Sequence, residues 1–442
     1  MGLSRQDPVR AVVPGDSLRP APHAAAAAAS WLDEGRLAAH LAARNVARSG
    51  LYVHVPFCAV RCSYCDFSTG PISDALVERY LRSLLIEMEL RATASRGVRF
   101  HSVFFGGGTP STLTPVQFTR VATALREHFD VAAGAEITLE ANPESVRDDR
   151  LEAWAGAGVN RLSFGAQSFD AGDLRVLGRI HDVERPAIAV GRARAHGFER
   201  LSLDLMFGYP GHSTGAWSHT LDSLFGLHPE HLSAYCFIPE PGTPLGDAVA
   251  NGAALLPDDG AQADAYSQLE RRAVAEGFAC YETSNFCRPG AEARHNLVYW
   301  LRRPYVGLGP SAHGHLAGRR TGNHHDRVEW MQSLEQGRGP EAESETETAA
   351  SRAREILMLG LRLADGLHAG DYADAEWRDV ERLYGGALQR AVVEGRLELG
   401  PLGPRIAAVH RFVADDVIAW LDAAAELPRV DIVDHGSIIS AG

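Results

Sequence analysis

Three cysteines in one short segment have the spacing that most clearly suits metal chemistry. Cys58, Cys62 and Cys65 stand in HVPFCAVRCSYCDF at C-x3-C-x2-C. Thiolates are soft ligands suited to iron–sulfur clusters, and three of them leave one iron open to bind a cofactor or substrate directly. A structural zinc site would want a fourth Cys or His nearby, and a chance group of free thiols is the remaining alternative. The spacing therefore favours a [4Fe-4S] cluster.

A run of glycines marks a place where the backbone can approach a ligand closely. The segment FFGGGTPS contains Gly106, Gly107 and Gly108, followed by Thr109. Consecutive glycines let amides and carbonyls come near a small molecule, although such a run is most often only a turn. No lysine follows, and the whole chain contains none. The segment is therefore not a phosphate-binding P-loop, and no lysine imine can form.

Four polar residues fall on or just after apolar, strand-like runs. Glu140 ends EITLE, Gln167 follows RLSFG, Arg179 comes twelve residues later, and Asp204 interrupts LSLDLMF. A carboxylate inside such a run is costly to bury unless a partner donates hydrogen bonds to it. Each of these residues, taken alone, could be an ordinary polar residue on the protein surface. Together they mark the C-terminal ends of strands, where barrel enzymes build their sites.

The elements that must position these residues alternate between strand and helix patterns. Short apolar runs begin at residues 51, 102, 136, 161, 201 and 231, with helical patterns between them at 76–90, 116–129, 149–155, 184–196 and 214–227. Such alternation predicts a parallel sheet covered by helices. Six units are too few for a closed eight-stranded barrel, and the polar strand ends argue against a flat, doubly wound sheet. We predict an α/β fold built on a partial (β/α)6 barrel.

Changes in composition divide the chain into regions. Residues 1–48 are rich in Pro, Ala and Arg and are expected to form a poorly ordered arm with one helix near 31–44. The barrel and its extension are expected over 49–335. The alternating glutamates of 337–350 are typical of a solvated linker or loop. Residues 351–430 show helical patterns and a hairpin, which predict a small winged-helix-like α+β domain.

The cysteine motif, with an aromatic residue before its last cysteine, resembles that of radical S-adenosylmethionine (SAM) proteins; the aromatic residue is Tyr64. In that family the open iron chelates the amino and carboxylate groups of SAM, and a reducing electron splits off a 5′-deoxyadenosyl radical. The resemblance implies a [4Fe-4S] cluster, SAM and an electron donor. The segment with Gly107, Gly108 and Thr109 resembles the motif that binds the SAM amino group.

The later polar positions resemble the coproporphyrinogen-dehydrogenase-like branch of this family. The match implies that Arg179 and Glu140 hold the methionyl groups of a SAM. It also implies that Gln167 and Asp204 bind the ribose hydroxyls. Other cofactor positions in this match are Tyr52, Tyr64, Gly107, Gly108, Thr109 and Cys236. The resemblance covers about residues 51–430.

Two functions compete within this branch. Oxygen-independent coproporphyrinogen dehydrogenases carry a further cysteine two residues after the last ligand, where this chain has Phe67. The segment RHNLVYW instead resembles the HNxxYW signature of heme chaperones, which implies heme binding by His295, Asn296, Tyr299 and Trp300. Histidine is a natural heme ligand, and Tyr and Trp can pack on a porphyrin, whereas a buried histidine with two core aromatic residues is the plain alternative.

We therefore expect a heme chaperone, with oxidative decarboxylation of a porphyrinogen as the alternative function. Whether the chain turns over SAM is left open. A second heme ligand could come from His313 or His315, which follow in GLGPSAHGH.

Charge and composition limit the partners and the location. A formal net charge of −13, from 43 basic against 56 acidic residues, disfavours nucleic acid as a partner. Six cysteines are too few for a disulfide scaffold. No segment suits a secretory signal or a membrane helix. We expect a cytoplasmic protein, and the resemblance implies heme, an electron donor and heme-accepting proteins, membrane cytochromes among them, as partners.

Overall fold

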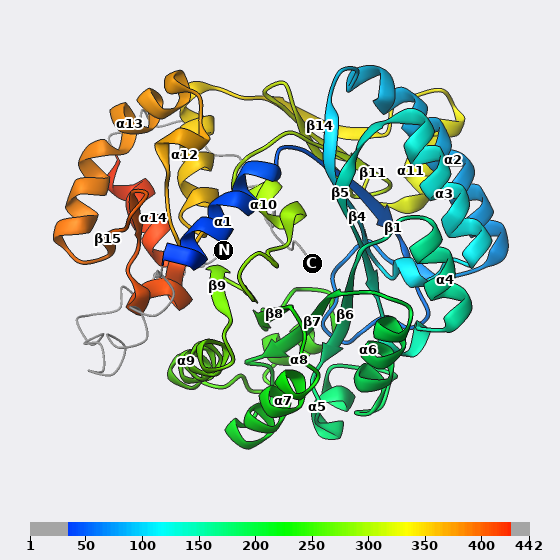
Figure 1. Ribbon diagram of the computed structural model, residues 1–442, viewed down its shortest axis with the longest axis horizontal. Coiled ribbons are helices and arrows are strands. Elements are labelled where there is room, and N and C mark those ends of the chain that lie inside the picture. The colour runs from blue at the N-terminus through cyan, green and yellow to red at the C-terminus, as the bar shows by residue number, and fades with distance from the viewer. Residues whose placement is uncertain (1–33, 426–442) are drawn as a thin grey trace, which may run out of the picture.

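A computed structural model describes residues 34–425, and its central feature is a sheet of twelve strands. Six of these are parallel neighbours in sequence order: β1 (Gly50–Val55), β4 (Arg99–Gly107), β5 (Asp130–Ala141), β6 (Arg161–Gln167), β7 (Arg200–Phe207) and β8 (His231–Cys236). The connecting helices lie on the outer side of the curved sheet: α2 (Asp74–Ala94), α3 (Pro115–His128), α4 (Asp148–Gly156), α6 (Arg185–Ala195) and α7 (Thr214–Gly226) (Figure 1). The predicted partial (β/α)6 barrel is confirmed.

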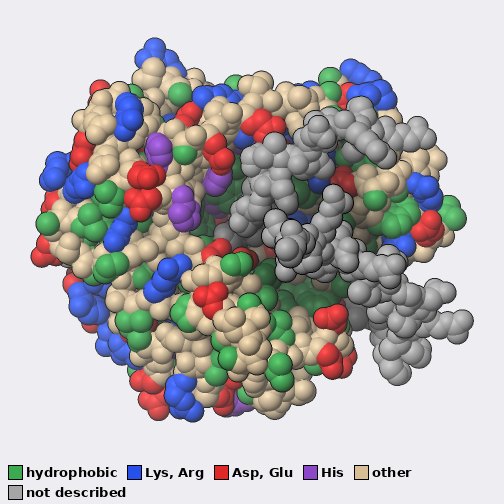
Figure 2. Space-filling model, turned by 180° about the vertical axis from the view of Figure 1, so that it is seen from behind, with side chains coloured by type: hydrophobic (Ala, Val, Ile, Leu, Met, Phe, Trp, Pro, Cys, Tyr) green, Lys and Arg blue, Asp and Glu red, His purple; other side chains and the backbone are tan. Residues whose placement is uncertain are grey.

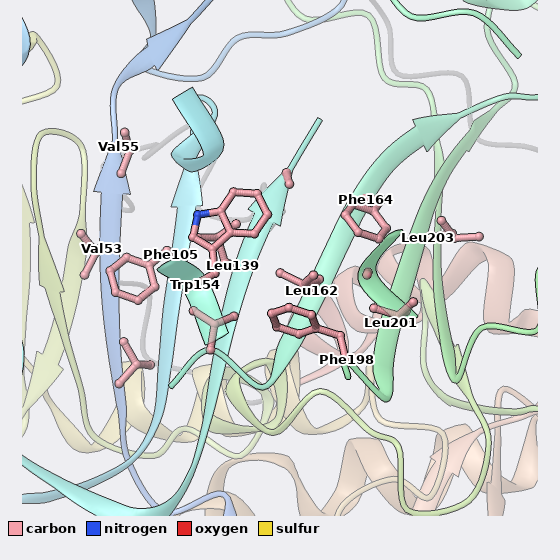
Figure 3. Close-up of a cluster of buried hydrophobic side chains, with 14 of the residues drawn as sticks. Val53, Val55, Phe105, Leu139, Trp154, Leu162, Phe164, Phe198, Leu201 and Leu203 are labelled. Atoms are coloured by element: carbon pink, nitrogen blue, oxygen red, sulfur yellow. The ribbon is translucent and has the colours of Figure 1, made fainter. Parts of the chain in front are cut away.

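Alternation along the strands sorts their side chains between the two faces of the sheet. Leu139, Leu162 and Leu201 belong to one buried cluster with Trp154 of α4, on the helix-covered side (Figure 3). Burying each such leucine contributes roughly 2 kcal/mol, so this face stabilises the fold. Because successive strand residues point to opposite faces, the residues between the leucines point into the barrel. The polar residues of the same strands thereby line its interior.

A short helix after β6 determines where the next polar residues lie. Asp170 caps α5 (Ala171–Val176), accepting hydrogen bonds from the backbone amides of Gly172 at 2.7 Å and Asp173 at 3.1 Å. This cap starts the helix directly after the strand and brings Arg179 back over the end of the barrel. The sequence patterns did not predict α5.

The chain after β8 extends both edges of the sheet. One edge ends in β10 (Asn285–Cys287) and β9 (Ala279–Glu282), which follow α8 (Pro244–Ala250) and α9 (Asp259–Ala275). The helix α10 (Arg294–Trp300) then leads to β11 (Tyr305–Leu308), which pairs in parallel with β1. Beyond it lie β12 (His313–Leu316), β13 (Arg319–Asn323) and β14 (Glu341–Thr346), with α11 (Arg327–Glu335) before the last strand.

The strand β14 corrects the expectation of a linker or loop over 337–350. Its alternating glutamates remain largely exposed, as expected, but its backbone pairs with β13 from Arg319↔Thr346 to Asn323↔Glu341. Arg319 also lies 2.7 Å from Glu341 across the pair. Hydrogen bonds to β13 and this ion pair stabilise a strand that its residue types disfavour.

A smaller domain follows the sheet and has its own hydrophobic core. It contains α12 (Ala349–Gly360), α13 (Asp374–Val393), the hairpin of β15 (Leu397–Leu399) and β16 (Pro404–Ile406), and α14 (Ala414–Ala424). These are the helices and hairpin expected from the sequence. The helix expected in the N-terminal arm is α1 (Glu34–Val46), which lies between the small domain and the barrel (Figure 1); residues 1–33 of the arm fall outside the described residues.

The surface mixes charges of both signs. On the face shown in Figure 2, arginine and acidic side chains are interspersed, with no broad area of a single sign. Among residues 34–425, no helix has the length and apolar character needed to cross a membrane.

Candidate functional site

The cysteine loop lies at the C-terminal ends of the parallel strands, which form the mouth of the barrel. Cys58 closes β2 (Phe57–Cys58), and pairing of β2 with β3 (Gly70–Pro71) ties the two ends of the loop together. In its middle, the Ser63 hydroxyl donates to the Val176 carbonyl at 2.7 Å, and the Ser63 carbonyl accepts from the Leu245 amide at 2.8 Å. The loop is thus fixed to both sides of the mouth.

The three predicted ligands are free, half-buried thiols. Burial raises the pKa of Cys58, and burial with the nearby Cys62 and Cys58 raises the pKa of Cys65 to about 12. Thiolates at these positions therefore need positive charge beside them, which iron supplies, so the donors fit a [4Fe-4S] cluster. Within residues 34–425, no three His, Cys, Asp or Glu side chains gather closely enough for a single metal ion.

Arg179 connects the cysteine loop to the neighbouring strands. Its guanidinium donates to Cys62 Sγ at 3.2 Å, to Asn142 Oδ1 at 2.7 Å and to the Gly165 carbonyl at 2.8 Å. The side chain is thereby held beside the thiols, within reach of a group bound there.

The glycine run packs directly against the cysteine loop and β1. Gly107 has a φ of 105°, and a Cβ there would lie 2.6 Å from the His54 ring. A Cβ at Gly108 would lie 2.8 Å from the Phe57 carbonyl oxygen. Thr109, which is buried, lies 3.3 Å from Cys58 through its hydroxyl. Glycine is therefore needed at both positions for the end of β4 to approach the cysteines.

Two carboxyl groups lie inside the barrel below the mouth. Asp204 accepts from the Ser163 hydroxyl, which is 3.0 Å and 3.1 Å from its two oxygens. Burial raises the pKa of Asp204, and burial together with the nearby Asp204 raises the pKa of Glu140 to about 8. Gln167 ends β6 with a φ of 64°, a conformation that is strained for a residue with a side chain. These three predicted residues are thus gathered at the barrel opening and interior.

Tyr64 and Cys236 occupy the side of the mouth near β8. Tyr64 packs against a small apolar cluster that includes Leu177 and Tyr209. The Cys236 thiol, at the end of β8, donates to Gln262 Oε1 at 3.1 Å. Both residues border the mouth, and the Tyr64 side chain also hydrogen-bonds to Cys62.

The segment RHNLVYW forms α10, and its residues point in different directions. His295 stacks on Phe104 and Tyr52 of the inner barrel face, with ring centroids 5.1 Å and 6.5 Å apart. Its Nδ1 lies 2.9 Å from the Ser102 hydroxyl and its Nε2 2.8 Å from the Tyr299 hydroxyl. Burial lowers the pKa of His295 to about 3, so the ring is neutral. His295 and Tyr299 thus belong to the barrel interior.

The other two predicted heme-binding residues of α10 have different surroundings. Trp300 packs in a cluster with Ala43 of α1 and Leu359 of the small domain, and Arg362 lies 5.8 Å from its ring centroid. Asn296 is half-buried. The alternative heme ligands differ from each other: His313 is exposed, whereas His315 is buried 2.7 Å from Glu347.

Comparisons with known proteins agree with this arrangement. The profile of the Radical SAM superfamily matches residues 52–224. The protein named heme chaperone HemW of Mycobacterium tuberculosis is 37% identical over 355 residues, covering 78% of this chain and 91% of the relative. That of Bacillus subtilis is 33% identical, with the same coverage of both chains. The chain belongs to the HemW family of radical SAM proteins.

A solved structure shares the fold along nearly the whole chain. Coproporphyrinogen III oxidase (HemN) from Escherichia coli superposes with a TM-score of 0.73 at 23% identity, covering 89% of this chain and 94% of that structure. Such a likeness establishes the fold and not the reaction.

Sequence reasoning missed one residue that supports the HemW-family site, His54 of β1. Its Nε2 donates to the Ser68 carbonyl at 2.9 Å, so its Nδ1 accepts from the Tyr52 hydroxyl at 3.1 Å. Burial lowers the pKa of His54 to about 4, which keeps the ring neutral. His54 therefore links Tyr52 to the end of the cysteine loop. The sequence feature that could have indicated this role is the spacing: His54 comes two residues after Tyr52, so both side chains point to the same face of the strand.

Proposed function

We propose that this chain binds a [4Fe-4S] cluster, SAM and heme, and that it delivers heme to acceptor proteins. The observation that carries the proposal is the position of α10. Its His295 and Tyr299 lie on the inner barrel face, where His295 stacks on Tyr52, a residue matched to SAM proteins. The residues matched to heme chaperones and those matched to SAM binding therefore share one interior.

Each cofactor has a defined set of candidate residues in this chain. Cys58, Cys62 and Cys65 would hold the cluster, which together with SAM supplies one-electron chemistry when bound. Glu140 and Asp204 would accept hydrogen bonds from SAM, because their oxygens face the interior. The thiols, the carboxyl groups and α10 are held by different elements, so each cofactor can be tested separately.

His295 is the proposed heme ligand, and its surroundings define what ligation requires. Neutral imidazole is the form that binds metal, and the low pKa of His295 provides it. Both ring nitrogens have partners, so ligation would replace either the Ser102 or the Tyr299 hydrogen bond. Tyr299 would then turn its hydroxyl elsewhere and present its ring to the porphyrin.

The proposed partners are an electron donor for the cluster and heme-accepting proteins, membrane cytochromes among them. A reducing cytoplasm suits the chain because all six cysteines are free thiols.

A heme titration of anaerobically reconstituted protein tests the proposal. We expect saturable heme binding, and His295→Ala should weaken it and alter the Soret band while the iron content stays constant. His231→Ala is a matched control, since His231 is also buried with Ser202 and Tyr281 hydroxyls at its two nitrogens. If His295→Ala keeps both the heme affinity and the Soret spectrum, His295 is not the iron ligand, and His313 becomes the next candidate.

The competing function is oxidative decarboxylation of coproporphyrinogen, the reaction of the dehydrogenases that the cysteine motif and polar strand ends also resemble. Phe67 stands where such enzymes carry a further cysteine. We expect no protoporphyrinogen when reconstituted protein is incubated with coproporphyrinogen III, SAM and a reductant. Its formation would overturn the chaperone proposal, whatever the heme titration shows.

A further inference from the structure

Arg161 is a buried cation inside the barrel that pairs with no carboxylate. Four arginines are buried among residues 34–425, and three of them have carboxylate oxygens close by: Arg44 (Asp365, 2.5 Å), Arg302 (Glu355, 2.6 Å) and Arg405 (Glu398, 2.6 Å). Arg161 is 3% exposed, yet it makes no hydrogen bond or ion pair within that part of the chain. A buried charge without a partner is costly, so the position needs another explanation.

The direction of the Arg161 side chain follows from the strand β6. Leu162 and Phe164 point into the helix-facing core (Figure 3), so Arg161 and Ser163 point into the barrel. Ser163 pairs in register with Glu140 on β5, and Arg161 pairs with Thr138. Arg161 therefore lies two residues below Glu140, about 7 Å along the strand. It lies further below Asp204, because its register partner on β7 is Arg200.

The positive charge of Arg161 interacts with titratable side chains on several elements. Electrostatic interactions link it to Glu140 of β5 and Asp204 of β7, and also to His231 of β8 and His295 of α10. These elements surround the barrel interior, into which the strand register points the Arg161 side chain. It is close enough to influence both carboxyl groups but forms a direct pair with neither.

The chemistry around Arg161 indicates the kind of ligand that would pair with it. Tyr52, Phe104 and His295 offer stacked, flat surfaces beside it, which suit a planar aromatic molecule. A planar ligand with carboxylate side chains suits both the aromatic rings and Arg161, because guanidinium binds carboxylate with two parallel hydrogen bonds.

We propose that Arg161 binds a propionate carboxylate of a tetrapyrrole held inside the barrel. The proposal rests on the proposed function insofar as the interior takes a tetrapyrrole, but it does not depend on iron ligation by His295. It defines the orientation of the ligand, with a carboxylate edge toward the floor of the barrel and the ring beside Tyr52 and α10.

Iron-free coproporphyrin III and its tetramethyl ester test the proposal without involving iron ligation. Anaerobically reconstituted protein is titrated with each, following tryptophan fluorescence. The wild-type protein should bind the acid at least about tenfold more tightly than the ester, as expected for a charged hydrogen-bonded pair. Equal affinities would overturn the proposal, and this comparison needs no variant.

Two substitutions distinguish direct binding of a carboxylate by Arg161 from a role in which its positive charge only balances the nearby carboxyl groups. Arg161→Gln should weaken acid binding about tenfold and leave ester binding unchanged. Arg161→Lys should also weaken it, because lysine lacks the two-pronged geometry; full rescue by lysine would make Arg161 a counter-charge only, against the proposal. Arg200→Gln is the control, since Arg200 is the register neighbour on β7 but already donates to the Gly290 carbonyl at 2.6 Å.

The remaining outcomes distinguish this inference from the proposed function. If Arg161→Gln lowers the affinity for SAM and not for the porphyrin, the carboxylate is that of SAM and the inference is wrong. If the wild-type protein binds neither porphyrin nor heme, both proposals fail. If heme does not bind but coproporphyrin III binds through Arg161, the chaperone proposal fails and the inference stands.

Discussion

Asp204 shows how one residue inside a strand can be both structurally tolerated and available to a ligand. The hydroxyl of Ser163, on the neighbouring strand, can donate only one proton, although both Asp204 oxygens lie within 3.1 Å of it. A carboxylate has about four acceptor positions, and the Ser202 hydroxyl, at 3.5 Å, and Ser233 also hydrogen-bond to Asp204. A ribose hydroxyl would take the remaining position.

We therefore expect Asp204→Asn to weaken SAM binding about tenfold, because the amide replaces one acceptor oxygen with a donor. Calorimetry of the reconstituted protein measures the affinity, and the iron content should not change. Asp173→Asn is the matched control, since Asp173 is also buried and accepts from Ser168 at 2.9 Å but lies on α5. Equal SAM affinity in both variants would make Asp204 a structural residue.

The cysteine assignment leads to a second prediction at single residues. Cys62→Ser should abolish the [4Fe-4S] cluster, because a hydroxyl is a poor iron ligand and Arg179 Nη1 points at this position. Iron analysis and visible absorbance after anaerobic reconstitution measure the loss. Cys280→Ser should keep the cluster, since the Cys280 thiol is buried elsewhere and donates to the Glu282 carbonyl at 3.0 Å. Unchanged iron in Cys62→Ser would refute the assignment.

Part of this site was predictable from the sequence and part was not. The cysteines and glycines are contiguous, so local spacing indicated them. Ser163 and Asp204 lie 41 residues apart and meet only through the pairing of β6 with β7. His54 and Arg161 looked like ordinary strand residues, because burial of a polar side chain depends on what the rest of the sheet encloses.

At the scale of elements, the end of β4 shows how closely two segments must approach. The cysteine loop and the glycine run meet backbone to backbone, so neither can move aside for a side chain. The six strands and five of the helices followed from periodicity. The strand β14 did not, because glutamates rarely favour strands and the register with β13 is a long-range property.

We expect Gly108→Ala to destabilise this contact by about 1–3 kcal/mol and to lower the cluster content. The added Cβ would lie 2.8 Å from the Phe57 carbonyl oxygen, a backbone atom that cannot rotate away. Gly156→Ala at the end of α4 meets nothing within 4 Å and serves as the control. Iron content and thermal unfolding of the two variants are compared. A Gly108→Ala protein that matches the control in both would contradict the predicted close contact.

At the scale of the whole molecule, α1 connects the small domain to the barrel through buried ion pairs. His40 lies 3.2 Å from Asp365 and 3.4 Å from Glu292, and Arg44 lies 2.5 Å from Asp365. Asp365 belongs to the segment after α12, and Glu292 precedes α10. One helix before the barrel therefore holds both the small domain and the proposed heme segment in place.

This arrangement predicts a pH-dependent stability. Burial opposes the charge of His40, but Asp365 and Glu292 outweigh it and raise the pKa to about 9. Folding therefore favours the protonated imidazole, which adds up to about 3 kcal/mol to the free energy of unfolding. This stabilisation is fully present below pH 6.5 and is lost as the pH rises through 9. Thermal unfolding of wild type and His40→Gln should differ most at low pH and converge above about pH 9. A difference that stays constant from pH 6 to 10 would refute the role of His40.

The row of glutamates along β14 also has a bearing on how molecules of this protein meet one another. An unpaired strand edge can template association between copies, and carboxylates repel such an encounter. Glu343 and Glu345 lie exposed on this outermost strand of the described sheet, whereas Glu341 is paired with Arg91 and Arg319. Their repulsion depends on ionisation and weakens in acid and at high ionic strength. The protein should therefore remain dispersed in dilute neutral buffer and associate through this edge when acidified, a colloidal property that is independent of any cofactor in the barrel.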